Sequence, residues 1–251
     1  MKYDELFDSE ENQALMAICT RKLIRNIGIG GIVWGLINIV LGFILLRVTI
    51  INAGILLLGM LMFGTGVQAL RNPSLDVLRA EAIVSVLLFL WNLGITLLNL
   101  KEAGTFEPRG LIFPLIVAAT VSNYYRKLGH LRHQIESVEP ARIEDTQRLC
   151  KLLLKKKLKA EPMVVETTDR RCRVQLMDGH AFFIQRDLMR AFVGKHDAIR
   201  KAVSKPETMK WSMAFKHPLG KLKYKFDKKS TEKLRHWLTG EPQQADGVTA
   251  M

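Results

Sequence analysis

The chain has 251 residues, 48% of them hydrophobic and 24% charged, with a formal net charge of +13. Residues 1–125 hold nine basic and nine acidic residues, whereas residues 126–251 hold 28 basic and 15 acidic ones. This separation of hydrophobicity from charge argues against a single soluble domain. The composition favours a membrane-embedded half followed by a basic half.

The first 25 residues predict a cytoplasmic segment rather than a signal peptide. Acidic side chains come first, and a short basic cluster follows at Arg21, Lys22 and Arg25. A cleaved signal peptide has basic residues ahead of its apolar region, which is the reverse order. We therefore expect residues 1–25 to remain on the chain ahead of the first membrane span.

Four uncharged segments predict an α-helical transmembrane bundle over residues 26–125. A helix needs about 20 mostly apolar residues to cross the hydrocarbon core of a bilayer. Asn26–Leu46, Val48–Leu70 and Ala82–Leu100 contain no charged residue over 21, 23 and 19 positions. Gly110–Tyr125 has 16 uncharged residues, and the arginines at its ends can extend toward water. We expect four spans, at about residues 26–46, 48–70, 80–100 and 109–125.

Basic residues outside the spans predict the orientation of the bundle. A basic cluster precedes the first span, and a dense basic series follows the fourth, from Arg126 to Lys159. Cytoplasmic flanks of membrane spans carry an excess of Lys and Arg. We therefore expect both termini in the cytoplasm and the protein in the plasma (inner) membrane.

One face of the first span is made of small residues. They recur at steps of three and four and are Gly28, Gly31, Gly35, Asn38 and Gly42. Gly31 and Gly35 form a G-x-x-x-G pair, which lets two helix backbones approach closely. We expect this face to pack against a helix, and it is also the natural contact for a homo-oligomer.

A stripe of polar residues follows one side of the third span. Its members are Glu81, Ser85, Asn92, Thr96 and Asn99. Polar groups that face lipid are costly, so we expect the stripe to face the bundle interior. Two interpretations stay open: a small polar path or ligand site, or hydrogen bonds between helices from Asn92 or Asn99 to Asn38 or to the glycine face. Glu81 is expected near the cytoplasmic end of its span, where water can reach it.

Residues 126–160 predict basic helices next to the membrane. The fourth span is expected to continue as a helix to Ser137, and a further helix is expected over about 140–160. One side of that helix carries Lys151, Lys155 and Lys159. Basic clusters beside a span attract anionic lipid, although a solvated face that fixes the topology has the same pattern. Both interpretations stay open.

Residues 161–238 predict a small cytoplasmic α+β domain with the order ββαββα. Alternating polar and apolar residues indicate strands on both sides of Asp178-Gly179, which is typical of a two-residue hairpin turn. A helix is expected near Leu188–Val203, broken or bent at Gly194, followed by a second hairpin over 210–226. Ser230 is expected to cap the last helix. Residues 239–251 are expected to form a disordered tail.

Alternation in the two hairpins predicts a sheet with one apolar and one basic face. The basic face would carry Arg171, Arg173, Lys210, Lys216, Lys221, Lys223 and Lys225. Like charges that face one another across strands are destabilising. Such a face therefore needs solvent, salt or an anionic partner.

No catalytic or metal-binding motif is found. Cys19, Cys150 and Cys172 are too scattered for a disulfide framework or a C-x-x-C site. His130 and His133 stand three residues apart, but no third ligand stands at a suitable spacing. We therefore expect no catalytic residue, no metal and no cofactor, and nothing in the sequence supports an enzyme.

The functional hypothesis is a multi-pass membrane protein with a basic cytoplasmic domain that binds an anionic surface, in an adaptor or regulatory role. Anionic phospholipid of its own bilayer is the first candidate, because tethering keeps the domain near it. An acidic partner or nucleic acid is the second, although the aromatic residues of the hairpins face the core instead of stacking on bases. The alternative function is a small oligomeric transporter or channel that uses the polar stripe of the third span.

Overall fold

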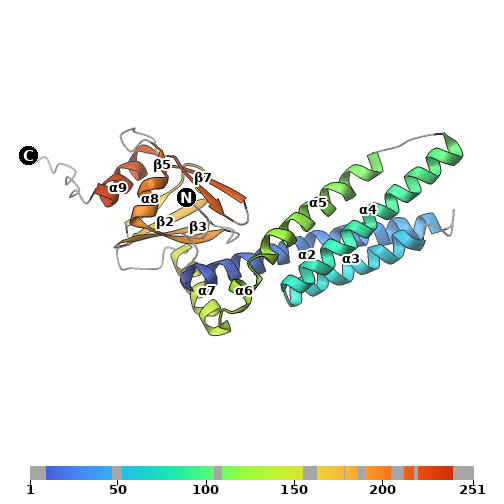
Figure 1. The fold of residues 1–251 in the computed structure, drawn as a ribbon, viewed down its shortest axis with the longest axis horizontal. Coiled ribbons are helices and arrows are strands. Elements are labelled where there is room, and N and C mark those ends of the chain that lie inside the picture. Colours follow the sequence, from blue (N-terminus) through green and yellow to red (C-terminus); the bar gives the residue numbers. More distant parts are fainter. Residues whose placement is uncertain are drawn as a thin grey trace, which may run out of the picture. The chain divides into compact units, whose positions relative to one another are not determined.

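The computed structural model describes residues 10–46, 53–104, 109–154, 163–177, 179–185, 190–204, 212–217 and 220–239. The chain divides into two compact units: a helical unit, Thr20–His133, and a strand-containing unit, which joins Met1–Cys19 to Gln134–Met251. Figure 1 shows the helices and strands in chain order. The N-terminal residues thus belong with the C-terminal part of the chain, which the sequence analysis did not foresee.

The first described element, α2 (Glu10–Leu46), is a continuous helix of 37 residues. The sequence predicts a span that starts only at Asn26, but no Gly or Pro stands between Glu10 and Asn26 to end a helix. Residues up to Cys19 belong to the strand-containing unit, and the rest of α2 belongs to the helical unit. The acidic N-terminal segment is therefore in part a helix that packs within the strand-containing unit.

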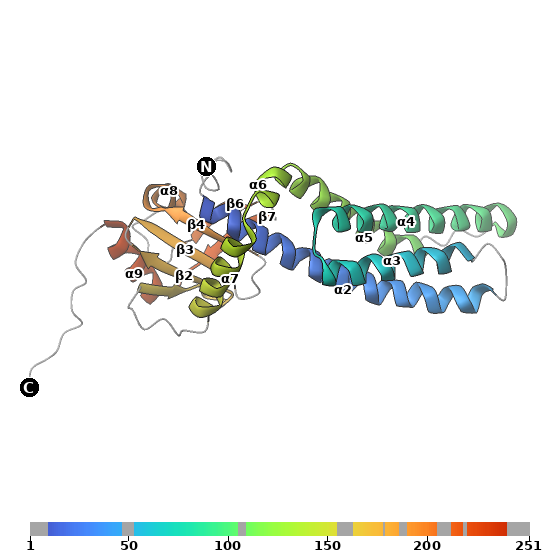
Figure 2. The same ribbon diagram turned by 90° about the horizontal axis from the view of Figure 1, so that it is seen from below.

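The helical unit also contains α3 (Ala53–Arg71), α4 (Leu75–Ala103) and α5 (Arg109–Gly129). Figure 2 shows α2, α3 and α4 running side by side. Helix α4 begins after Ser74, whose hydroxyl accepts a hydrogen bond from the Val77 N–H, and it ends at Gly104, which has a φ of 66°. These two residues supply the cap and the left-handed conformation that limit a helix at its two ends.

Three of the described helices, α2, α3 and α4, are long and apolar enough to cross a membrane. Large apolar side chains are exposed on them, including Ile29, Phe43, Leu57 and Leu90. Exposed apolar surface of this extent is typical of a membrane protein. The first three predicted spans are confirmed as apolar helices of sufficient length. A fourth span is not shown, because the last turns of α5, Ser122–Lys127, are polar.

Two shorter helices follow α5: α6 (Arg132–Glu136) and α7 (Pro140–Leu154). The sequence predicts an unbroken helix to Ser137, but α5 ends at Gly129, a residue with low helix propensity. A turn replaces the helix there, and the Leu131 N–H donates to the Leu128 carbonyl at 3.0 Å. The predicted start of α7 at Pro140 is correct, because proline fits the first helical turn.

The strand-containing unit holds two antiparallel sheets. The first has the order β1 (Met163–Glu166), β2 (Cys172–Met177), β3 (His180–Gln185), β4 (Ala191–Lys195). The second has the order β5 (Val203–Ser204), β6 (Ser212–His217), β7 (Gly220–Lys225). Helix α8 (His196–Ala202) links the sheets along the chain, and α9 (Lys228–Thr239) follows the last strand.

The predicted helix over Leu188–Val203 is wrong over its first part. Ala191–Lys195 forms strand β4, in which Phe192 pairs with Phe183 of β3, and of the described residues in this segment only His196–Ala202 is helical. The predicted single sheet is also wrong, since β4 extends the first hairpin and the second hairpin joins β5 in a separate sheet. The predicted turn at Gly179 is confirmed by its φ of 74° and by the pairing of Met177 with His180.

Aromatic side chains connect the two sheets. The rings of Phe183 and Phe192 stack with centroids 4.5 Å apart, and the ring of Tyr224, from β7, lies 5.5 Å from that of Phe183. Leu15 and Cys19 of α2 are fully buried in the same unit. The hydrophobic core therefore draws on both ends of the sequence.

Asn12 fixes α2 to the edge of the first sheet. Its side-chain nitrogen donates to the Val193 carbonyl at 2.9 Å, and its side-chain oxygen accepts from the Val193 N–H at 2.7 Å. Strand β4 is an edge of that sheet, so Asn12 takes up hydrogen bonds that a further strand would otherwise use.

The last helix is capped by Asp227, and the prediction of Ser230 as the cap is wrong. The carboxylate of Asp227 accepts a hydrogen bond from the Ser230 N–H at 2.7 Å. Ser230 lies in the first turn of α9, is buried, and donates from its hydroxyl to the Glu166 carbonyl at 3.2 Å. Of the predicted tail, Thr239 lies in α9 and the remainder is outside the described residues.

Candidate functional site

The β6–β7 hairpin has one buried and one basic face. Lys223 and Lys225 are exposed, whereas Tyr224 and Phe226 are 4% and 2% exposed. Burial raises the pKa of the Tyr224 phenol, so this ring stays neutral in the core. In the register of the two strands Lys216 stands directly opposite Lys221, and both alternate with the core positions. Their side chains lie outside the described part of the structure.

The other predicted anion-binding residues are distributed over several elements. Lys151 is exposed in the last turn of α7, and Arg171 is exposed just before β2. Lys155, Lys159 and Lys210 lie outside the described residues. Among the predicted residues whose side chains are described, only Lys223 and Lys225 share one face of a strand.

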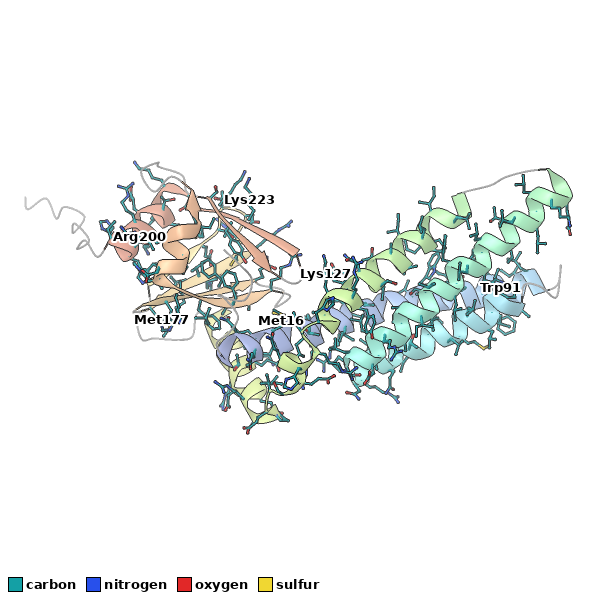
Figure 3. All side chains as sticks on the ribbon, viewed as in Figure 1. Met16, Trp91, Lys127, Met177, Arg200 and Lys223 are labelled. Atoms are coloured by element: carbon teal, nitrogen blue, oxygen red, sulfur yellow. The ribbon has the colours of Figure 1, made fainter. Side chains whose placement is uncertain are left out.

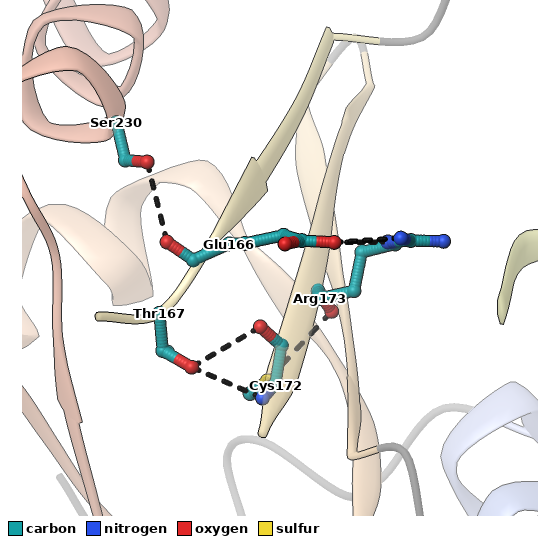
Figure 4. Close-up of polar contacts among 5 residues, drawn as sticks. All are labelled: Glu166, Thr167, Cys172, Arg173 and Ser230. Carbon is teal, nitrogen blue, oxygen red and sulfur yellow. Dashed lines mark hydrogen bonds and ion pairs between the residues drawn. The ribbon is translucent and has the colours of Figure 1, made fainter. Parts of the chain in front are cut away.

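Arg173 does not lie on an exposed basic face, and its predicted role is corrected. The residue is 7% exposed, and its guanidinium forms an ion pair with Glu166 at 2.6 Å, as Figure 4 shows. Glu166 stands directly opposite Arg173 on β1. Strand β2 is an inner strand buried on both faces up to Leu176, so alternation in the sequence could not reveal which side is exposed.

Polar contacts around this ion pair connect β1, β2 and α9 (Figure 4). The hydroxyl of Thr167 accepts from the Cys172 N–H at 3.0 Å and also lies 2.6 Å from the Asp169 carboxylate. The hydrogen bond from Thr167 lowers the pKa of Asp169. Ser230 of α9 binds the Glu166 carbonyl. The pattern of these contacts is that of a structural network that closes the turn between β1 and β2.

Two exposed basic residues missed by the sequence analysis follow the β6–β7 hairpin in the sequence. Lys228 and Lys229 are exposed in the first turn of α9, directly after Phe226. Positive charge is unfavourable at a helix N-terminus, where the backbone dipole favours anions. Their position near Lys225 in the sequence was a signal that alternation alone did not capture. We use the name lysine hairpin for Lys223, Lys225, Lys228 and Lys229.

The polar stripe of α4 divides into a buried and an exposed part. Glu81 and Ser85 are 1% and 2% exposed. Asn92 and Thr96 are half-buried, and each binds a carbonyl of its own helix, at Leu88 and Asn92. Asn99 is exposed. The expected bonds from the stripe to Asn38 are not formed, because Asn38 donates to the Trp34 carbonyl of its own helix.

Glu81 is the stripe residue that contacts two other helices. Its carboxyl oxygen Oε2 is hydrogen-bonded to the hydroxyl of Thr65 on α3. Its Oε1 faces Gly31 of α2, where any Cβ would collide with it. The expectation that water reaches Glu81 is wrong, since the side chain is enclosed by the bundle while Arg79 is exposed.

The glycine face of α2 is covered by α3 and, at Gly31, by Glu81 of α4 in the same chain. All five predicted residues, Gly28, Gly31, Gly35, Asn38 and Gly42, are buried. A Cβ at Gly35 would lie 2.6 Å from the backbone nitrogen of Phe63, and one at Gly42 would lie 2.7 Å from the Cα of Leu56. A homo-oligomer through the first span would therefore need a different face of α2.

Thiol and metal chemistry have little support among the described residues. All three cysteines are buried, and burial raises the pKa of the Cys150 thiol to about 11. In the described part of the chain no three His, Cys, Asp or Glu side chains gather in a way that could hold a metal ion. The candidate site is therefore a binding surface, the lysine hairpin, together with the buried carboxyl of α4.

Comparison of the chain with protein-family models, with curated proteins and with solved structures finds no match.

Proposed function

We propose that this protein is a multi-pass membrane protein whose basic domain binds the anionic headgroups of the membrane in which it is embedded, in an adaptor or regulatory role. The observation that carries the proposal is the lysine hairpin, in which exposed Lys223 and Lys225 alternate with the buried Tyr224 and Phe226. The charges on this hairpin are independent of the core, and no described ion pair involves them.

The proposal includes α5 as a fourth crossing of the inner (plasma) membrane, which places both termini in the cytoplasm. Ile112, Phe113, Leu115 and Ile116 of α5 are about half exposed, as lipid-facing residues are. An even number of spans agrees with basic residues at both ends of the bundle. The strand-containing unit, which includes residues from both ends of the chain, then lies on the cytoplasmic side.

Lipid is favoured over nucleic acid for a physical reason. Proteins that bind single strands stack bases on exposed aromatic rings. The aromatic residues of β7 and its end, Tyr224 and Phe226, are buried instead. A lysine near an anionic membrane surface contributes about 1 kcal/mol, so the four residues of the lysine hairpin can act together without aromatic contacts.

The experiment is flotation of the full-length protein with liposomes. The protein is held in nanodiscs of neutral lipid and mixed with neutral liposomes or with liposomes that contain phosphatidylglycerol. We expect co-flotation only with anionic liposomes, with loss of binding at raised salt, because screening weakens surface electrostatics. Equal flotation with neutral liposomes would overturn the proposal, as would capture by nucleic acid in preference to anionic lipid.

Charge-reversal variants locate the binding surface. The variant Lys223→Glu/Lys225→Glu is expected to abolish flotation and to leave the fold intact, because both side chains are exposed. The matched control is Lys195→Glu/Arg200→Glu, which makes the same change of charge at exposed positions on β4 and α8. Figure 3 labels Lys223 and Arg200 on the strand-containing unit. Equal losses in both variants would mean that net charge, not the hairpin, determines binding.

The second candidate function, a small oligomeric transporter or channel, draws on the buried part of the stripe. Glu81 and Ser85 are enclosed among helices, which a polar path would require. Asn92 and Thr96, farther along α4, bind carbonyls of their own helix. They therefore do not continue the buried polar path beyond Ser85. Asn92→Leu is expected to abolish a flux if the path exists, and to change only stability if the stripe serves helix packing.

A further inference from the structure

The hydrogen bonds around Thr65 determine which group carries the proton. The hydroxyl of Thr65 lies 3.0 Å from the Met62 carbonyl and also contacts Oε2 of Glu81. A hydroxyl has one proton to donate, and a carbonyl oxygen can only accept. If Thr65 donates to Met62, the proton between Thr65 and Glu81 must come from the carboxyl. Both contacts are satisfied together only when Glu81 is a neutral acid.

The surroundings of Glu81 also favour the neutral acid. The side chain is 1% exposed, and in the described part of the chain no cation forms an ion pair with it. The charged side chains at the corresponding ends of the four helices are exposed. They are Arg25 on α2, Arg71 on α3, Asp76 and Arg79 on α4, and Arg126 and Lys127 on α5. A buried carboxylate without a partner is strongly disfavoured.

The second oxygen of the carboxyl and the next polar residue remain without partners. Oε1 of Glu81 and the hydroxyl of Ser85 are both buried and form no hydrogen bond. Oε1 faces the backbone of α2 at Gly31, and a side chain at that position would require the carboxyl of Glu81 to move. Ionisation would place negative charge against this helix contact. Water would then have to enter beside Gly31 and Ser85 to solvate the charge.

We infer that Glu81 is a proton-binding site of the helical unit, and that the bound proton keeps α2 packed against α3 and α4. The reaction is the transfer of one proton between the carboxyl oxygen Oε2 and water, with no other bond made or broken. In the protonated form Glu81 donates to Thr65, and Thr65 donates to Met62. In the ionised form Thr65 turns its proton to Glu81, and the contact at Gly31 opens to water. This inference is independent of the proposed binding of anionic lipid.

The test is infrared spectroscopy of the full-length protein in lipid as the pH is raised. The protonated acid gives a carbonyl band distinct from that of a carboxylate. We expect such a band in the wild type and none in Glu81→Gln, and we expect the band to disappear as the pH rises. Absence of the band at every pH would overturn the inference. So would a band that persists unchanged at every pH, because the site would then not exchange its proton.

Chemical labelling provides a second readout at the level of the residue. Dicyclohexylcarbodiimide, an apolar reagent, modifies protonated carboxyls in apolar surroundings, and the adduct can be located by mass spectrometry. Glu81 is expected to be labelled, with a loss of about tenfold per pH unit once the carboxyl ionises. Glu102, at the exposed end of the same helix, is the matched control and should stay unlabelled. Labelling of Glu102 instead of Glu81 would contradict the inference.

A further pair of variants tests which group accepts the hydrogen bond of the protonated carboxyl. Thr65→Val removes the group that accepts the proton of the acid, so the infrared band should shift while still disappearing at high pH. Ser85→Ala removes a hydroxyl that has no partner and should leave the band in place. An unshifted band in Thr65→Val would show that the carboxyl does not donate to Thr65.

Discussion

The two units accommodate a glutamate in opposite ways. In the strand-containing unit Glu166 meets the guanidinium of Arg173 at 2.6 Å, and the charge of the buried Arg173 is balanced there. In the helical unit Glu81 meets only the hydroxyl of Thr65 and the backbone of Gly31. The sheet therefore keeps a charged pair, whereas the bundle is suited to a neutral acid. The difference is that a cationic partner balances the carboxylate in one region, whereas in the other we infer that a proton does so.

Their polar contacts also differ in reach. Asn12 binds Val193 and Ser230 binds Glu166, across 181 and 64 positions of the sequence. In the helical unit Asn38, Asn92 and Thr96 each bind a carbonyl four positions away on their own helix. In the strand-containing unit these polar pairs connect distant segments, whereas in the helical unit a buried bond between helices joins Thr65 with Glu81. Packing in the helical unit also depends on the close approach of backbones at glycine.

The largest expected effect comes from removing the carboxylate of Glu166, which balances the charge of the buried Arg173. Glu166→Gln leaves Arg173 charged and 7% exposed, which should destabilise the strand-containing unit by about 3 kcal/mol. Glu81→Gln replaces a neutral acid with a neutral amide and should change the stability of the helical unit little. All three cysteines lie in the strand-containing unit, so thiol labelling against denaturant measures its stability separately. Most of the described helical residues belong to the helical unit, so the loss of helical circular dichroism with denaturant mainly measures the unfolding of that unit.

The double variant Glu166→Gln/Arg173→Leu is the control for this comparison. It removes both charges, so it should be more stable than Glu166→Gln alone, because no charge is left buried without a partner. If Glu166→Gln is as well tolerated as Glu81→Gln, the contrast between the two units is wrong.

The next effect concerns the glycine face of α2. A Cβ at Gly35 would lie 2.6 Å from the backbone nitrogen of Phe63, and backbone cannot move as a flexible side chain does. Gly35→Ala should therefore lower the stability of the helical unit by about 1–3 kcal/mol through overpacking. Gly30→Ala, where the added carbon meets nothing within 4 Å, should be neutral or slightly stabilising. Similar thermal midpoints for the two variants would show that α2 and α3 do not pack at Gly35.

The parts that sequence could predict are those with a long and regular signal. Absence of charge over some twenty residues identified the first three spans, and steps of three and four identified Gly28 to Gly42 as one face. The hairpin at Gly179 was also predictable, because its turn needs a residue with positive φ.

The rest depended on contacts that are remote in the sequence. Arg173 alternates like Lys223, but β2 is an inner strand covered on both faces, whereas β7 is an edge strand. Strand β4 has five residues and follows residues that suit a helix, so pairing with β3 determines its conformation. Nothing local indicated that Asn12 would bind Val193.

A smaller effect is expected from separating α2 from the sheet edge. Asn12→Leu removes both hydrogen bonds to Val193, so the N–H and carbonyl of Val193 lose their partner. The free energy of unfolding of the strand-containing unit should fall by about 1–2 kcal/mol. Cys19, fully buried on the same helix, should then react faster with thiol reagents. Gln13→Ala, at the neighbouring half-buried position, is the control and should leave Cys19 protected. Unchanged protection in Asn12→Leu would mean that apolar packing alone holds this part of α2.

The smallest effect is the cap of α9, and it carries a dependence on pH. The Ser230 N–H bound to the Asp227 carboxylate lowers the pKa of Asp227 below its ordinary value. A carboxyl whose pKa is lowered on folding stabilises the folded state above its unfolded pKa, and this contribution is lost as the pH falls. Asp227→Ala should therefore destabilise the strand-containing unit by about 1 kcal/mol at neutral pH. This loss of stability relative to the wild type should shrink on acidification, because the wild type loses its charged cap.

The control for the charge is Asp227→Asn, which caps without a charge. Its stability should stay close to that of the wild type at neutral pH and exceed it in acid. Asp169, whose pKa is also lowered, is unchanged in all three proteins, so differences between their thiol-labelling midpoints isolate the cap. A deficit in Asp227→Ala that is the same at every pH would show that the charge of Asp227 does not contribute.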